Sequence, residues 1–175
     1  VLDAYGQDWT EDDKMEKIHA FRVRMLKSLN NGTVKDIDSV IMYKDSVELG
    51  IIELCKEKAV KPILKIDEGV EGNGTLKMFD INGILDFAVE HGCVGTKMRS
   101  IDYDLYMIDP VLTQQFALGK YVSMRGLMPI IEPEVPISHP NKHDIEIRMR
   151  ERMEVRLDTI DYECTLKLTI PNKTG

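Results

Sequence analysis

The chain has 175 residues, of which 43% are hydrophobic and 30% are charged, and its formal net charge is −7. This length and composition suit one soluble domain with a substantial apolar core. The acidic balance argues against nucleic acid or an anionic membrane as partner, because proteins that bind either carry a basic patch. No apolar run is long enough to span a bilayer, so we expect no membrane association.

The cysteines and histidines form no disulfide or metal motif. The three cysteines lack the CxxC spacing, and each lies in or beside an apolar segment, as reduced thiols of a cytoplasmic protein do. His139 and His143 are four residues apart, a spacing that can chelate a metal from a helix, but Pro140 lies between them. With no third ligand evident, we expect no metal site.

Apolar residues at helical spacing predict helices along the whole chain. Thr10 and Asp13 indicate the start of the first helix, since a threonine cap with an acidic third residue satisfies free backbone N–H groups. Its expected inner face is Met15, Ile18, Phe21, Met25 and Leu29, and it should end at 30–32. Further helices are expected from Ser46 (with Val47, Ile51, Leu54 and Cys55), over 81–90, from Asp109 to Gly126 (Val111, Leu112, Phe116 and Val122 inward), and over 144–157 (Ile145, Met149, Met153 and Val155 inward).

Short apolar strands alternate with these helices. They are expected at 38–43, 62–67, 93–99, 128–132 and 163–171. Strict alternation of helices with strands that are apolar on both faces is typical of parallel strands covered by helices. An open doubly wound sheet and a (β/α)8 barrel both fit this order. A complete barrel takes about 250 residues, so a barrel would lack about three strands here. We expect one α/β domain over residues 1–175.

Charged side chains lie toward the carboxyl ends of four of the expected strands. Because strand side chains alternate between faces, each strand directs its charges to one side. The sets are Lys65 with Asp67, Lys97 with Arg99, Glu132 with Glu134, and Lys167 with Thr165 and Thr169. Parallel α/β folds carry their sites at this end of the sheet, so we expect one shared pocket. The alternative is four independent structural salt bridges.

A cluster of this kind has a specific chemical use. Crowding several cations in a partly desolvated pocket favours loss of a proton from one lysine, and a neutral amine can attack a carbonyl to form a Schiff base. Lys167, in an apolar strand, is the best candidate for the nucleophile, and Glu132 is the natural general acid/base. The remaining cations could hold a phosphate or carboxylate. Considered alone, Lys167 is also compatible with a solvated lysine on an edge strand.

Four stretches of the chain carry these residues, and together they point to a known family. They read LKIDEG at 64–69, GTKMRS at 95–100, PIIEPE at 129–134 and LKLTIP at 166–171. In this order they resemble successive strand motifs of class I fructose-1,6-bisphosphate aldolase, most like its bacterial branch, and the resemblance runs from about Arg22 to Pro171. It implies a (β/α)8 TIM barrel that cleaves fructose 1,6-bisphosphate to dihydroxyacetone phosphate and glyceraldehyde 3-phosphate in glycolysis and gluconeogenesis, without a metal or other cofactor.

By motif, the resemblance also implies a role for each residue. Lys167 would form the Schiff base, Glu132 would be the general acid/base, and Lys97 would assist at the carbon bond that breaks. The substrate-binding candidates are Lys65 and Arg99, near the C6 phosphate, together with Glu134 and Arg24, the latter matching a phosphate-binding arginine on the first helix.

The chain departs from the family pattern at both ends. It would carry barrel strands two to six, so the family's first-strand aspartate would lie before Val1 and the glycine-rich phosphate loops would follow Gly175. Glu68 stands where the family often has lysine. We therefore expect the 175-residue chain alone to have little or no activity.

Two other functions stay open at this point. One is another lysine Schiff-base aldolase of the barrel class, which the Glu132-Pro133-Glu134 stretch together with Lys97 and Arg99 disfavours. The other is a non-catalytic sugar-phosphate-binding or scaffold fragment. In either case the expected partner is a small-molecule sugar phosphate, and a homo-oligomer also stays open.

Overall fold

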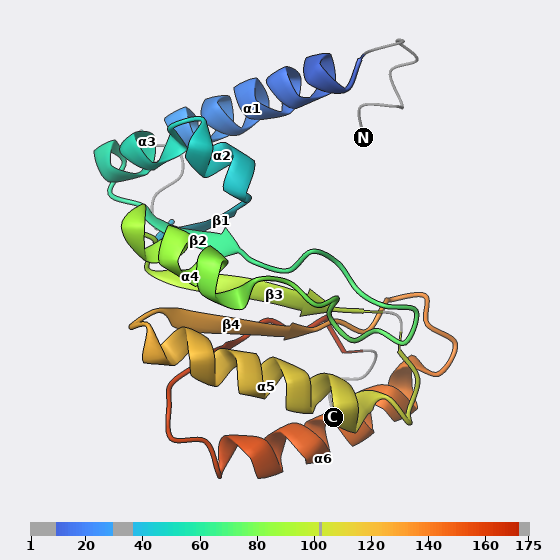
Figure 1. Cartoon of the computed structure of the whole chain (residues 1–175). Coiled ribbons are helices and arrows are strands. Elements are labelled where there is room, and N and C mark those ends of the chain that lie inside the picture. Colours follow the sequence, from blue (N-terminus) through green and yellow to red (C-terminus); the bar gives the residue numbers. More distant parts are fainter. Residues whose placement is uncertain (1–9, 30–36, 102, 172–175) are drawn as a thin grey trace. The chain divides into compact units, whose positions relative to one another are not determined.

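The computed structural model describes residues 10–29, 37–101 and 103–171 (Figure 1). The chain divides into two compact units, Val1–Pro62 and Ile63–Gly175, with the boundary inside the strand β2 (Lys61–Lys65). The five strands lie in the order β1-β2-β3-β4-β5. The single domain expected over 1–175 stays a prediction.

The first unit contains one long helix and two short ones. Its elements are α1 (Glu11–Ser28), β1 (Ser39–Met42), α2 (Lys44–Glu48) and α3 (Ile51–Glu57). The predicted start of α1 is confirmed, because the Thr10 hydroxyl accepts from the Asp13 N–H at 3.1 Å and the Asp13 carboxylate accepts from the Thr10 N–H. The helix ends at Ser28, and the expected end at 30–32 lies outside the described residues.

Two predictions for the first unit are wrong. The helix expected from Ser46 is two helices, because Gly50 adopts a left-handed conformation (φ 83°) between α2 and α3. The predicted inner face of α1 is also misplaced, since Phe21 and Met25 are exposed while Leu26 is buried. The buried stripe therefore runs one residue later than the apolar spacing suggested.

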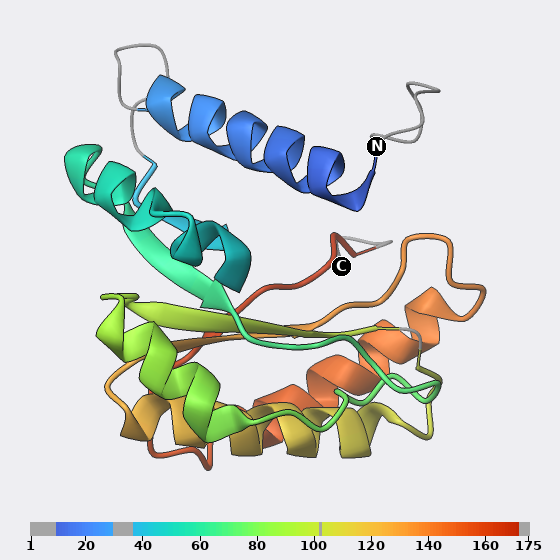
Figure 2. The same ribbon diagram turned by 45° about the horizontal axis from the view of Figure 1, so that its top comes forward.

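The second unit is built from alternating helices and parallel strands. After β2 come α4 (Ile81–Glu90), β3 (Gly95–Ser100), α5 (Ile108–Met124), β4 (Met128–Pro133), α6 (Lys142–Leu157) and β5 (Thr165–Leu166). Strands β2 to β5 pair in parallel, each with the next. Figure 2 shows α4, α5 and α6 on the same side of these strands. A doubly wound sheet carries helices on both faces, so within this unit the arrangement is that of a barrel wall.

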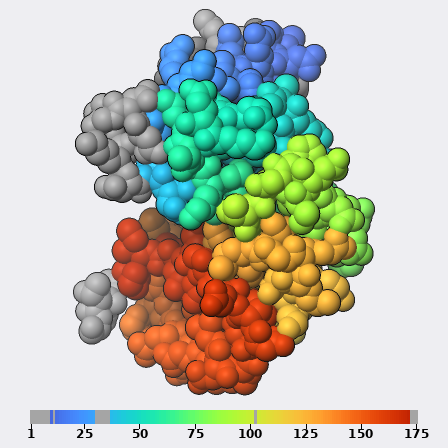
Figure 3. Space-filling view, turned by 90° about the vertical axis from the view of Figure 1, so that its left-hand side faces the viewer, coloured from blue at the N-terminus to red at the C-terminus, as the bar shows by residue number. Residues whose placement is uncertain are grey.

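The core of the second unit lies between the strands and these helices. The outward-facing strand residues Leu64, Met98 and Ile131 are fully buried there. The predicted inner face of α5 is confirmed, with Val111, Leu112, Phe116 and Val122 all buried. On α6 the residues Ile145, Met149 and Met153 are buried as predicted, but Val155 is exposed because it lies off that stripe. In Figure 3 the orange surface of α6 borders the red surface of the segment that follows it.

Strand β5 is much shorter than the stretch predicted at 163–171, and the neighbouring strand explains why. The Lys167 N–H donates to the Ile131 carbonyl at 3.0 Å, which continues the parallel ladder by one bond. The next bond would need an N–H at Pro133, which proline does not have. The ladder therefore stops at Lys167, and this residue lies just past the strand instead of inside it.

The close approach of β3 to β4 generates a prediction about stability. A Cβ placed at Gly95 would lie 2.5 Å from the Met128 carbonyl oxygen. Gly95→Ala should therefore push the two strands apart and lower the free energy of unfolding by about 2 kcal/mol, measured by urea denaturation. Gly72→Ala is the control, because nothing lies within 4 Å of a Cβ there; equal stability of the two variants would contradict the prediction.

Candidate active site

The structure brings charged side chains from four neighbouring strands together on the helix-free face of the second unit. The strand register places Lys65 beside Lys97, and Glu132 lies on the next strand. The Lys65 Nζ is 2.8 Å from the Asp67 Oδ1, and the Lys97 Nζ is 2.9 Å from the Glu132 Oε2. Lys167 donates to the Glu132 Oε1. Four of the predicted residues thus form one linked cluster, with Asp67 as its fifth member.

Glu132 is at the centre of this cluster. Its side chain is almost fully buried, and its two carboxylate oxygens face lysines from β3 and from the end of β5. The Oε2 atom is buried and has no aligned hydrogen-bond donor among the described residues, although the Lys97 ammonium is at ion-pair distance. This oxygen is paired with a positive charge but accepts no hydrogen bond, so it can still accept a proton from the hydroxyl of a ligand.

A glutamine on α5 accepts a hydrogen bond from the main chain of Glu132 on the helix-covered side of the strands. Gln115 is fully buried; its Nε2 donates to the Ser100 hydroxyl at 2.8 Å, and its Oε1 accepts from the Glu132 N–H at 3.3 Å. It therefore joins the carboxyl ends of β3 and β4. Sequence reasoning missed Gln115, although a glutamine on the otherwise apolar inner face of a helix is a signal that could have found it.

Asp67 has a larger part in the cluster than the family resemblance gave it. Its side chain is buried, its Oδ2 accepts from the Arg99 N–H at 3.1 Å, and the same oxygen is 3.8 Å from the Lys97 Nζ. Three lysines and two carboxylates leave one net positive charge when all five are ionised. Since buried charge is costly unless it is balanced, the cluster favours an added anion.

Lys167 is more accessible than predicted. Its side chain is 52% exposed, against 8% for Lys97 and 4% for Glu132. The expectation that Lys167 lies within an apolar strand is wrong, because β5 ends before it and is the last strand of the order. A ligand can therefore reach its amine from solvent.

The remaining candidates lie at the edge of the cluster or outside it. Arg99 and Glu134 form a separate, partly exposed ion pair, with Arg99 Nη1 3.3 Å from Glu134 Oε2. Arg24 lies on α1, in the first unit, and its part in the site stays a prediction.

A tyrosine that the sequence did not single out follows β3. Tyr103 is buried, and its ring packs where a side chain at Gly74 would clash. Burial, and to a smaller extent the charge of Glu134, raise the pKa of its hydroxyl, which therefore stays protonated. That hydroxyl has no hydrogen-bond partner among the described residues, so it is available as a donor at the carboxyl end of the strands.

Two kinds of feature are absent from the described part of the chain. No group of three or more histidine, cysteine, aspartate or glutamate side chains there could hold a metal ion. None of the helices in that part is long and apolar enough to cross a membrane.

Comparison with known proteins supports the fold. No family model matches the sequence. Among solved structures, the chain is similar to a fructose-bisphosphate aldolase from Plasmodium falciparum, which was crystallised with TRAP and a small-molecule inhibitor. The TM-score is 0.58 at 15% identity, over 92% of this chain and 60% of that one. The predicted fold class is confirmed: the chain has an α/β fold of the (β/α)8 barrel type, with five of the eight strands of such a barrel among the described residues.

The shared carboxylate generates a second prediction. Glu132→Gln removes the anion between two lysines and leaves three cations against one carboxylate. Because breaking a buried ion pair leaves uncompensated charge, we expect the free energy of unfolding to fall by about 3 kcal/mol. Glu134→Gln, in a partly exposed pair, should cost at most about 1 kcal/mol. Urea denaturation of both variants checks this, and a Glu132 variant as stable as the Glu134 variant would argue against it.

Proposed function

We propose that the chain is part of a class I aldolase that cleaves fructose 1,6-bisphosphate reversibly through a Schiff base on Lys167. The observation that carries the proposal is the Glu132 carboxylate held between Lys97 and Lys167. The four motifs and the aldolase-like fold support it. The chain spans 60% of the length of the aldolase that it matches, so the activity is proposed for the whole protein.

Schiff-base formation needs a neutral amine and an acid, and the ion pair of Lys167 with Glu132 can supply both. Transfer of one proton from the ammonium to the carboxylate leaves a nucleophilic amine beside a carboxylic acid. The amine attacks the C2 carbonyl of the ketose, and Glu132 returns its proton to the oxygen that leaves as water. The balance is one ammonium and one ketone giving one protonated imine and one water, with Glu132 regenerated.

The protonated imine then acts as an electron sink for carbon–carbon cleavage. The C4 hydroxyl loses its proton, the C3–C4 bond breaks to release glyceraldehyde 3-phosphate, and the bonding electrons move to the imine nitrogen. Glu132 is within reach as the base, and Lys97, 2.9 Å from it, offers a positive charge to the oxygen that loses the proton. This leaves an enamine on Lys167; Glu132, which now holds the proton from the C4 hydroxyl, returns it to C3, and hydrolysis of the regenerated imine releases dihydroxyacetone phosphate and the Lys167 amine.

The excess positive charge of the cluster suits a phosphorylated substrate. Lys65 and Arg99 would bind or orient it near the C6 phosphate, with Glu134 orienting Arg99 through their ion pair. Arg24 is proposed as a further phosphate ligand on the family resemblance alone. The same resemblance favours the bacterial branch and a cytoplasmic enzyme of glycolysis and gluconeogenesis that needs no metal.

The alternative is a barrel that binds a sugar phosphate without turning it over. The partial exposure of Lys167 favours it, since a lysine paired in solvent is also an ordinary surface feature. Covalent trapping separates the two, because a binding protein forms no imine.

We expect borohydride reduction with dihydroxyacetone phosphate to add mass to the peptide that contains Lys167. Reduction traps the imine even where turnover is low, so the 175-residue chain and any longer chain that contains it can both be tested by peptide mass spectrometry. Lys167→Met should abolish the adduct, whereas Lys120→Arg, at an exposed lysine paired with Asp161, should not change it. Absence of the adduct, or an adduct on another lysine, would count against the proposal.

We further expect Glu132→Gln to slow trapping by about 10²-fold or more, the size of general acid–base catalysis. EDTA should leave trapping unchanged, since the proposed chemistry needs no metal. In a steady-state assay, the 175-residue chain should turn over much more slowly than a longer chain. Equal trapping rates for Glu132→Gln and the unchanged chain would remove Glu132 from the mechanism.

A further inference from the structure

A buried lysine outside the cluster has no role in the mechanism above. Lys142 is the first residue of α6, and its side chain is 1% exposed. An ammonium so deeply buried is tolerated only when it is paired, because its desolvation is costly. Lys142 pairs with Glu146 one helical turn later, and its Nζ donates to the Ile170 carbonyl at 2.9 Å.

The Ile170 carbonyl belongs to the segment that carries Lys167. Ladder pairing of this segment with β4 ends at Leu166, apart from the hydrogen bond between the Lys167 N–H and the Ile131 carbonyl. Pro133 has no N–H with which to continue the ladder. Beyond that point the hydrogen bond from Lys142 ties the main chain to α6, only three residues after the proposed nucleophile.

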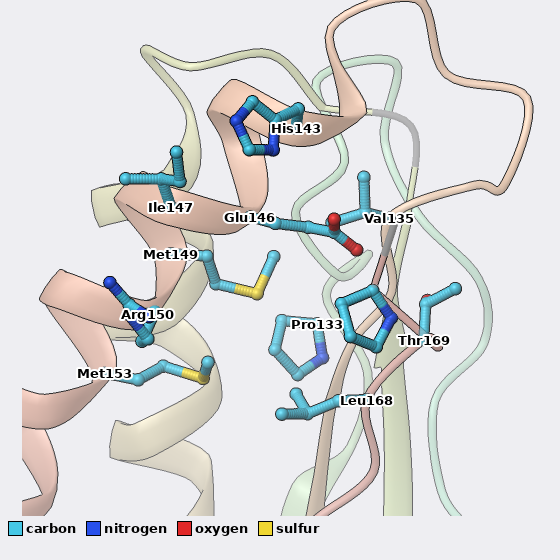
Figure 4. Close-up of a pocket in the computed structure, with 11 residues that line it drawn as sticks. Pro133, Val135, His143, Glu146, Ile147, Met149, Arg150, Met153, Leu168 and Thr169 are labelled. Atoms are coloured by element: carbon cyan, nitrogen blue, oxygen red, sulfur yellow. The ribbon is translucent and has the colours of Figure 1, made fainter. Parts of the chain in front are cut away.

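Side-chain packing holds this segment loosely. A cavity of about 570 Å³ lies between α6 and residues 168–171. Figure 4 shows Glu146 extending from α6 toward Thr169 and Val135 across this space, with Leu168 on the same wall as Thr169. Leu168 is 49% exposed and Ile170 is 80% exposed, so neither is fixed by burial. With little packing available, a directional hydrogen bond has to set the position of the main chain.

We infer that Lys142 is a positioning residue, which holds residues 168–170 against α6 so that the Lys167 amine stays on the Glu132 carboxylate. Glu146 supplies the counter-charge that allows Lys142 to be buried. The expected effect of Lys142 on the reaction rests on the proposed function of Lys167. The expected effect of Lys142 on the position of residues 168–170 does not. Loss of the anchor should misplace the amine without altering the residues that would bind phosphate.

The first variant is Lys142→Met in the longest chain that contains this sequence, because methionine keeps the unbranched stem and removes the donor. It also removes the cation that pairs with the half-buried Glu146, so Lys142→Met/Glu146→Leu is the second variant, in which both charges are absent. Lys120→Met is the matched control, since Lys120 is a partly exposed lysine on α5 paired with Asp161. Thermal unfolding shows that each variant is folded before the other measurements are made.

Two measurements test the inference. Hydrogen exchange of the Lys167 backbone amide should become at least about 10-fold faster in both Lys142 variants, because local opening sets exchange. Trapping of dihydroxyacetone phosphate on Lys167 should slow by about 10-fold to 10²-fold, as expected for a misplaced reacting group, with KM changed less than 2-fold and kcat reduced. The Lys120 control should match the unchanged chain in both.

The possible failures are distinguishable. Unchanged exchange and unchanged trapping in the folded double variant would overturn the inference. A rise in KM with kcat preserved would overturn it as well, since that pattern means lost binding and not a misplaced nucleophile. If the unchanged chain forms no adduct at all, the proposed function falls, and exchange at Lys167 still decides whether Lys142 holds the segment.

Discussion

The second unit depends on one buried carboxylate that faces two lysines from different strands. Glu132 is almost fully buried, so its charge has to be balanced, and Lys97 and Lys167 lie at its two oxygens; the buried Lys97 needs the carboxylate in return. The balance of charge therefore links the residues at the carboxyl ends of β3, β4 and β5. It also means that the charges of the site and the stability of the fold are not independent of one another.

The supports of the two proposed reacting groups differ in kind. Glu132 lies within a ladder strand and is held through its main chain by Gln115, which is itself fully buried. Lys167 follows the last ladder pair and leads into a segment that borders a cavity. The proposed general acid/base is therefore part of the sheet, while the proposed nucleophile lies on a short extension of it.

Much of this arrangement follows from the sequence, because it rests on local periodicity. The period of two in β2, β3 and β4 was enough to place Lys65, Lys97 and Glu132 on one face, and the apolar spacing of α5 was enough to find its buried side. Some features that depend on contact with a second segment were missed or misjudged. The length of β5 is decided by Pro133 on the neighbouring strand, and no property of residues 163–171 reveals it. Gln115 and Tyr103 were missed because their roles depend on contacts with other segments: Gln115 with Ser100 and Glu132, and Tyr103 with Gly74. Periodicity alone left both an open sheet and a barrel possible; the family resemblance favoured the barrel, and the positions of α4, α5 and α6 agree with it.

The absence of an N–H at Pro133 has a consequence for how the molecule should respond to heat. Because the ladder ends there, the chain bearing the amine can detach without breaking any bond between β3 and β4, and the rest of the unit can stay intact. Warming should then separate the amine from its carboxylate several degrees before the fold melts. This separation would be reversible over that interval, and it would become irreversible only once the whole sheet opens.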